Sequence, residues 1–118
     1  MTANATRKVA VLGGGLAGLA AALAFRQQGA DVTVFEQANE LKEVGAGLQI
    51  TPNGAVVLRA LGLEPRAAVT GLAALAVVPI DALTGRTIAR FDLTHLDGPP
   101  YRLFHRADLL AMLADACE

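Results

Sequence analysis

The first 40 residues alternate apolar runs with glycine in an order that predicts a strand, a turn, a helix and a second strand. Residues 8–12 form a short valine-rich run that stops at glycine, which is typical of a buried parallel strand. Leucine and alanine then recur at helical spacing from Leu16 until Gly29, which predicts a helix that packs closely on a sheet. Residues 31–35 alternate and are rich in β-branched side chains, so they predict a second strand that ends at Glu36.

The pattern after this unit is weaker and mixes short helices with extended segments. Residues 39–44 favour a turn of helix, and residues 48–51 favour a short extended segment. Pro52 suits the first position of a helix, with Thr51 as its N-cap, and the apolar spacing continues to about Leu61. We therefore expect a second helix here, closed by a glycine.

The last third of the chain predicts a hairpin and a final helix. Residues 75–81 and 86–91 flank turn residues and predict two antiparallel strands, to which residues 101–105 add a third. An apolar stripe of leucines predicts a helix from about Arg106 to the end of the sequence. The fold class that follows is α/β and Rossmann-like, with an incomplete parallel sheet and an inserted hairpin or meander.

Composition narrows the function more than the fold. The chain has 118 residues, enough for one domain at most. Its 10 Lys and Arg balance 11 Asp and Glu without a block of like charge, so we expect neither nucleic acid nor an anionic membrane as a partner. The single cysteine, Cys117, excludes an internal disulfide and favours a reducing, cytoplasmic location. The absence of serine excludes serine-nucleophile chemistry, and two isolated histidines predict no bound metal.

One alternative at the N-terminus is a signal peptide. Arg7 and Lys8 precede an apolar run over residues 9–25 that contains an Ala-x-Ala sequence at residues 22–24. Three glycines at positions 13–15 would break an export helix, and the run is too short and too interrupted for a confident membrane span. We therefore favour the strand and helix.

Residues 13–18 carry the candidate chemistry, because they satisfy the pattern G-x-G-x-x-G between a strand and a helix. Gly13 permits a tight turn, Gly15 lets a pyrophosphate touch bare backbone, and Gly18 lets the helix pack against the strand. Leu16 and Ala17 open the helix, whose free N–H groups and dipole favour the phosphates. The motif therefore predicts a dinucleotide site; the alternative is a glycine turn without a ligand.

Glu36 lies at the end of the second strand, eighteen residues after Gly18. A carboxylate in this register accepts hydrogen bonds from the hydroxyls of the adenosine ribose and repels a 2′-phosphate, which argues against NADP here. The alternative is a solvated acid at a strand end. Gln37 follows it and is included in the candidate site.

Four segments, in order along the chain, resemble the flavin-dependent aromatic hydroxylases (group A flavoprotein monooxygenases), such as salicylate hydroxylase and hydroxynicotinate monooxygenase. They are residues 13–23, 32–37, 43–54 and 105–110. The resemblance covers nearly all of the chain, and it implies FAD as cofactor, NAD(P)H as co-substrate and oxygen-dependent hydroxylation of a small aromatic compound. It leaves the substrate, the choice of NADH or NADPH, the oligomeric state and the catalytic residues open.

The resemblance also implies roles for residues outside the glycine motif. Arg106 matches an arginine that reaches the phosphate region of the cofactor, and its planar fork suits that contact. Lys42 lies where a basic residue often approaches the adenosine ribose, and Gly45 and Gly47 let a loop pass close to the cofactor. A surface arginine and a solvated lysine are the corresponding alternatives.

Members of this family are longer and carry a later Gly-Asp motif and an Asp-Gly motif that this chain lacks. We therefore expect residues 1–118 to be the N-terminal part of an FAD-binding domain, without the substrate domain, and the isolated chain to be inactive. Two alternatives stay open: an NAD-binding oxidoreductase domain, against which residues 45–53 argue, and a truncated fragment without catalysis.

Overall fold

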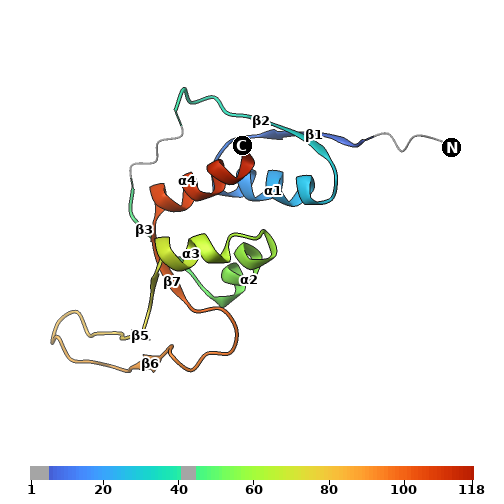
Figure 1. Ribbon diagram of the computed structural model, residues 1–118. Coiled ribbons are helices and arrows are strands. Elements are labelled where there is room, and N and C mark those ends of the chain that lie inside the picture. Colours follow the sequence, from blue (N-terminus) through green and yellow to red (C-terminus); the bar gives the residue numbers. More distant parts are fainter. Residues whose placement is uncertain (1–5, 41–44) are drawn as a thin grey trace. The chain divides into compact units, whose positions relative to one another are not determined.

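The computed structural model describes residues 6–40 and 45–118, which form two compact units (Figure 1). The first unit combines the chain up to Ala46 with His105–Glu118, and the second is Gly47–Phe104. The first unit therefore joins segments from both ends of the chain.

The first unit is built on the predicted strand, helix and strand. Strands β1 (Lys8–Leu12) and β2 (Asp31–Phe35) are parallel, with Lys8 opposite Asp31 and Leu12 opposite Phe35. Helix α1 (Leu16–Gln27) connects them, and Gly29 follows it with a φ of +81°, a left-handed conformation that suits glycine. Parallel strands need such a crossover, so the Rossmann-like α/β fold predicted from the sequence is confirmed.

A second helix completes this unit. Helix α4 (Arg106–Cys117) begins at the residue predicted from the apolar stripe and packs on α1. The buried side chains of the two helices form the core; they are Leu19, Ala22 and Leu23 of α1, and Leu109, Leu110, Met112 and Leu113 of α4.

The strands of this unit are less buried than their apolar sequences predict. Val11 and Val34 face α1 and are half-buried, whereas Leu12 is 85% exposed. In the described residues, β1 and β2 are thus covered on one face only, although the apolar run is typical of a buried parallel strand. An apolar run is typical of a sheet that is covered on two sides, but here α1 covers only one.

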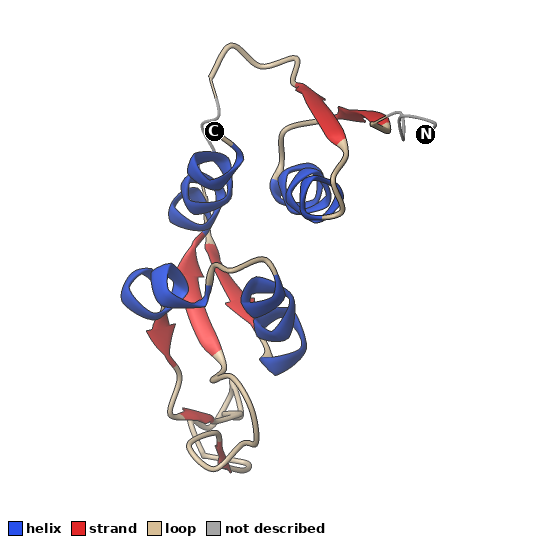
Figure 2. Cartoon of the chain, turned by 45° about the vertical axis from the view of Figure 1, so that its right-hand side comes forward, coloured by secondary structure: helices blue, strands red, loops and turns tan. Residues whose placement is uncertain are grey.

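The second unit contains a three-stranded sheet with two helices beside it (Figure 2). The strand order is β3 (Gly47–Ile50), β7 (Arg102–His105) and β4 (Leu72–Ala73), and β4 and β7 are antiparallel. Helix α2 (Pro52–Ala60) has Thr51 as its N-cap and Leu61 as its C-cap, which confirms the predicted helix. Phe104 of β7 is 2% exposed and is one of the buried apolar residues of this unit, with Ala55, Leu58, Leu63 and Ala67.

Helix α3 (Glu64–Thr70) is absent from the sequence prediction. The sequence does contain residues typical of helix ends, because Pro65 occupies the first turn and Gly71 is the C-cap. Its seven residues bury Ala67 and leave Val69 exposed, so the helical apolar pattern is too short to detect.

The predicted hairpin is present but its paired strands are short. Strands β5 (Ala76–Val77) and β6 (Phe91–Asp92) are antiparallel, and Ile80 pairs with Thr87 nearer the turn. The third strand of the meander was placed wrongly, because β7 pairs with β3 and β4 instead. Proline at positions 99 and 100 provides no N–H donors for a ladder beside β6, and Phe104 gains burial in the other sheet.

Candidate dinucleotide site

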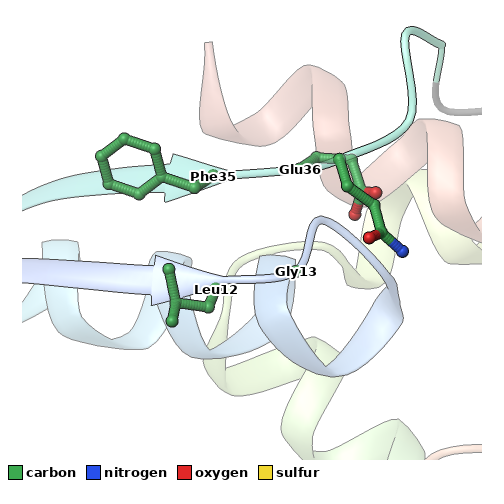
Figure 3. Close-up of a pocket in the computed structure, with 5 residues that line it drawn as sticks. Leu12, Gly13, Phe35 and Glu36 are labelled. Atoms are coloured by element: carbon green, nitrogen blue, oxygen red, sulfur yellow. The ribbon is translucent and has the colours of Figure 1, made fainter.

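The glycine-rich loop leaves β1 in a conformation that only glycine adopts readily. Gly13 has a φ of +104°, and its N–H donates a hydrogen bond to the carbonyl oxygen of Phe35 at 2.7 Å. This bond ties the start of the loop to the end of the second strand. The turn into α1 is thereby placed at the carboxyl ends of both strands (Figure 3).

Gly18 is required by close packing inside the unit. A β-carbon at this position would lie 1.9 Å from the carbonyl oxygen of Gly13 and 3.3 Å from Cγ1 of Val11. Because backbone cannot move aside as a flexible side chain can, the first turn of α1 reaches β1 only with glycine here.

Gly15 has neither of these reasons to be glycine. Its φ of −75° and ψ of −177° are open to any residue, and a β-carbon would meet nothing within 4 Å. Gly15 is the N-cap of α1, no side chain caps this end, and the first turn contains no acidic residue. The first N–H groups of a helix have no partner within it and attract an anion, and here they belong to Leu16 and Ala17, next to the open space at Gly15.

Glu36 lies directly beside this loop. One carboxylate oxygen accepts a hydrogen bond from the Gly14 N–H at 2.6 Å, and the other accepts one from the Ala38 N–H at 2.9 Å. Hydrogen bonds from Ala38 and Gly14 lower the pKa of Glu36 below its ordinary value, so the side chain is a carboxylate at neutral pH. The sequence predicted the acid at this strand end but not its bond to Gly14, which depends on the three-dimensional path of the loop.

An open hollow of about 490 Å³ adjoins the loop at the carboxyl ends of β1 and β2 (Figure 3). Its lining consists of Leu12, Gly13, Phe35, Glu36 and Gln37. In open parallel sheets, ligands bind outside the carboxyl ends of the strands. The hollow therefore brings the predicted residues Gly13, Glu36 and Gln37 together at one place.

Arg106 is the first residue of α4 and belongs to the same unit. Its N–H donates to the carbonyl oxygen of Ala46 at 3.4 Å, and a β-carbon on Gly45 would lie 3.6 Å from the Arg106 Cδ. That separation is an ordinary contact, so packing does not require glycine at position 45. Gly47 belongs to the second unit, and Lys42 lies outside the described residues.

The described part of the chain offers no membrane span, no metal site and no activated thiol. None of the helices formed by residues 6–40 and 45–118 is long and apolar enough to cross a bilayer. Within those residues, no three His, Cys, Asp or Glu side chains gather where they could hold a metal ion. The Cys117 thiol donates to the carbonyl oxygen of Leu19 at 3.7 Å, and burial raises the pKa of this thiol, which makes it a poor nucleophile.

The fold and the loop define a Rossmann-like dinucleotide-binding unit, and comparisons with known proteins agree. The family of NAD(P)-binding Rossmann-like domains matches residues 11–42. The 3-amino-4-hydroxybenzoate 2-monooxygenase of Streptomyces cremeus is 46% identical over 106 residues, which are 86% of this chain and 27% of that enzyme.

Solved structures of flavin-dependent oxygenases are also similar to this chain. The tetrameric form of 2-methyl-3-hydroxypyridine-5-carboxylic acid oxygenase matches with a TM-score of 0.85 and 30% identity, over 97% of this chain and 29% of that one. A Klebsiella pneumoniae protein in complex with FAD and uric acid matches with a TM-score of 0.81 and 30% identity, over 92% and 28%. The chain thus spans between 27% and 29% of the length of these relatives. These similarities confirm the resemblance to the FAD-dependent aromatic hydroxylases seen in the sequence, and the chain matches the N-terminal portion of these enzymes.

Proposed function

We propose that this chain is the segment that holds the ADP half of FAD in an FAD- and NAD(P)H-dependent monooxygenase that hydroxylates small aromatic compounds. The observation that carries this proposal is the open space beside the Cα of Gly15. Gly13 is explained by its backbone conformation and Gly18 by packing, but neither reason applies to Gly15, where a β-carbon would meet no described atom within 4 Å. A ligand that needs this space, such as a pyrophosphate, accounts for it.

The residues of the site fit that ligand. The pyrophosphate would lie against Gly15 and the first N–H groups of α1, where the helix dipole offsets its charge without a lysine. Glu36 would accept hydrogen bonds from the ribose hydroxyls. An ionised carboxylate offers about four lone-pair positions, so it can keep its bonds from Gly14 and Ala38 at the same time.

Arg106 and Gln37 complete the proposed contacts. Arg106 would bind a phosphate oxygen through its guanidinium, and Gln37 borders the hollow beside Glu36. The proposal also keeps Lys42, Gly45 and Gly47 as cofactor-binding residues on the basis of the family resemblance.

When bound, FAD supplies the redox chemistry that links NAD(P)H and oxygen to the aromatic substrate. The residues of this chain bind and orient the nucleotide end of the cofactor, and none of them is assigned a catalytic role. The proposed partners of the longer protein are a small aromatic compound, oxygen and NAD(P)H, and the proposed location is the cytoplasm.

An NAD-binding domain is the second candidate, because the loop and Glu36 suit either dinucleotide. The relatives favour FAD, because the matching regions belong to monooxygenases and to a protein solved with FAD. They extend over both units of this chain, whereas the general dinucleotide-binding family matches only residues 11–42.

Binding of ADP to the full chain tests the proposal, since ADP is the part of FAD that these residues would contact. We expect saturable binding in isothermal titration calorimetry, and weaker binding of 2′-phospho-ADP because Glu36 repels the extra phosphate. A chimera in which this chain replaces the matching residues of the Streptomyces cremeus monooxygenase should retain FAD. The proposal would be refuted if the folded chain does not bind ADP and the chimera purifies without FAD.

A further inference from the structure

The carboxylate of Glu36 joins the end of β2 to the glycine-rich loop, beside which it lies in Figure 3. Its Oε2 accepts a hydrogen bond from the Gly14 N–H at 2.6 Å, although the two residues are 22 positions apart in the chain. Its Oε1 accepts a second bond, at 2.9 Å, from the N–H of Ala38. The bond from Ala38 fixes the orientation of the carboxylate, and the bond from Gly14 then ties the loop to it.

Gly14 needs such an acceptor because it is buried, whereas Gly13 and Gly15 on either side of it are half-buried. A buried N–H without a hydrogen-bond acceptor is unfavourable, and an ionised carboxylate is a stronger acceptor than a neutral oxygen. Removal of the Glu36 side chain therefore favours loop conformations in which the Gly14 N–H turns toward water.

The loop depends on such bonds for its shape because it contains three consecutive glycines. Glycine has more backbone freedom than any other residue, so ordering it costs the most conformational entropy. Two successive N–H groups hold the loop to the end of β2, since Gly13 bonds to the Phe35 carbonyl oxygen at 2.7 Å and Gly14 bonds to Glu36. Gly15 follows directly as the N-cap of α1. The bond to Glu36 thus fixes the residue just before the proposed pyrophosphate contact.

We propose that Glu36 is a positioning residue for the pyrophosphate: through the Gly14 N–H it holds the glycine-rich loop in the conformation that receives the phosphates. This inference rests on the proposed function of the loop, and the role is additional to the contact of Glu36 with the ribose. A loop that is ordered in advance loses less conformational entropy when the ligand binds, so its affinity is higher.

The negative charge of Glu36 makes the two roles separable. A carboxylate near a phosphate repels it. If Glu36 acted on the ribose hydroxyls alone, its removal would leave the affinity for a nucleotide without these hydroxyls unchanged or would raise it. The positioning role predicts the opposite, because the loop is then less ordered for any ligand that carries the pyrophosphate.

The nucleotide for this test is 2′,3′-dideoxy-ADP, which keeps the adenine and the pyrophosphate but has no ribose hydroxyls. We expect Glu36→Ala to raise its Kd about three- to tenfold in isothermal titration calorimetry on the full chain. The Kd for ADP should rise by a larger factor, because the ribose contacts are lost as well. Glu36→Gln should lie between wild type and Glu36→Ala for the dideoxy nucleotide, since an amide oxygen is a weaker acceptor for the Gly14 N–H.

Asp31→Ala is the matched control, because it removes a carboxylate from an exposed position of the same strand. Asp31 begins β2, about 16–17 Å along the extended chain from Glu36, and its replacement should leave both Kd values unchanged. A second measurement follows the loop itself. In the chain without nucleotide, Glu36→Ala should speed amide hydrogen exchange at Gly14 while exchange in the middle of α1 stays the same.

Equal Kd values of wild type and Glu36→Ala for the dideoxy nucleotide, or tighter binding by the variant, would overturn the positioning role, as would unaltered exchange at Gly14. If Glu36→Ala does not fold, Glu36→Gln decides in its place: weaker binding than wild type supports the role, and equal or tighter binding overturns it. Should the folded wild-type chain bind neither nucleotide while the chimera retains FAD, the same variants are compared by competition with FAD for the chimera's apoprotein. If the wild-type chain does not bind ADP and the chimera does not bind FAD, the proposed function fails instead.

Discussion

A β-carbon on Gly18 would lie 1.9 Å from the carbonyl oxygen of Gly13, although five positions separate the two residues in the sequence. This closeness packs the first turn of α1 directly against the loop that leaves β1. Two glycines of one motif are therefore structural partners, whereas Gly15 between them has open space around its Cα. The difference allows the folding and the binding roles of the motif to be measured separately.

The first prediction compares Gly18→Ala with Gly15→Val. Gly18→Ala should lower the free energy of unfolding by about 1–3 kcal/mol, because overpacking against backbone outweighs the helix propensity of alanine. Gly15→Val should change that free energy by less than about 1 kcal/mol, a weaker N-cap being its main cost, but should abolish ADP binding. Urea unfolding and calorimetry measure the two quantities. A Gly15→Val variant that binds ADP normally would show that the pyrophosphate lies elsewhere.

The second prediction concerns Arg106. Its replacement by alanine should weaken FAD binding to the chimera by about 1.5–3 kcal/mol, the range of hydrogen bonds to charged groups. Lysine should recover only part of this loss, because a point charge cannot bond to two oxygens as the guanidinium does. Fluorescence titration of FAD into the apoprotein provides the Kd values. Equal affinities for wild type and Arg106→Ala would make Arg106 a surface residue at the start of α4.

The third prediction follows from the lowered pKa of Glu36. Because this pKa is depressed in the folded chain, Glu36 stabilises the fold fully above its ordinary pKa of 4.5, and this contribution is lost as the pH falls through the folded-state pKa. Carbon-13 NMR of the side-chain carboxyl group should show Glu36 titrating below pH 4.5. The acid-induced loss of stability should be smaller in Glu36→Gln than in wild type. Titration of Glu36 at or above its ordinary pKa would contradict the bonds from Gly14 and Ala38.

The fourth prediction tests the second unit independently of any ligand. A β-carbon on Gly71 would lie 2.5 Å from Cζ of Phe104, which is nearly inaccessible to solvent. Gly71→Ala should therefore destabilise this unit by about 1–3 kcal/mol, as overpacked core positions do. Gly85→Ala is not a neutral comparison because Gly85 has a φ of +70°, so Ala73→Ser at a strand position serves as the control. Hydrogen exchange in β7 would report the change, and protection equal to wild type would show that Phe104 can move.

The sequence alone determined the local structure of the first unit. Strong periodicity and glycine at the element ends predicted β1, α1 and β2, and the start of α4 was predicted at Arg106, where the structure has it. The candidate site followed from the same region, because a glycine motif and an acid at the next strand end are both local signals in the chain. Helix α3 was missed because seven residues contain too little periodicity.

The tertiary structure decided which distant segments meet. It paired β7 with β3 and β4 instead of extending the hairpin, it brought Gly14 to the carboxylate of Glu36, and it bonded the guanidinium of Arg26 to the carbonyl oxygens of Ala116 and Cys117. None of these contacts leaves a pattern in the sequence, because each depends on backbone donors and acceptors that every residue shares. Which groups pair depends on the path of the chain and on the burial of a few side chains such as Phe104. Both the path and the burial are established only when the elements pack together.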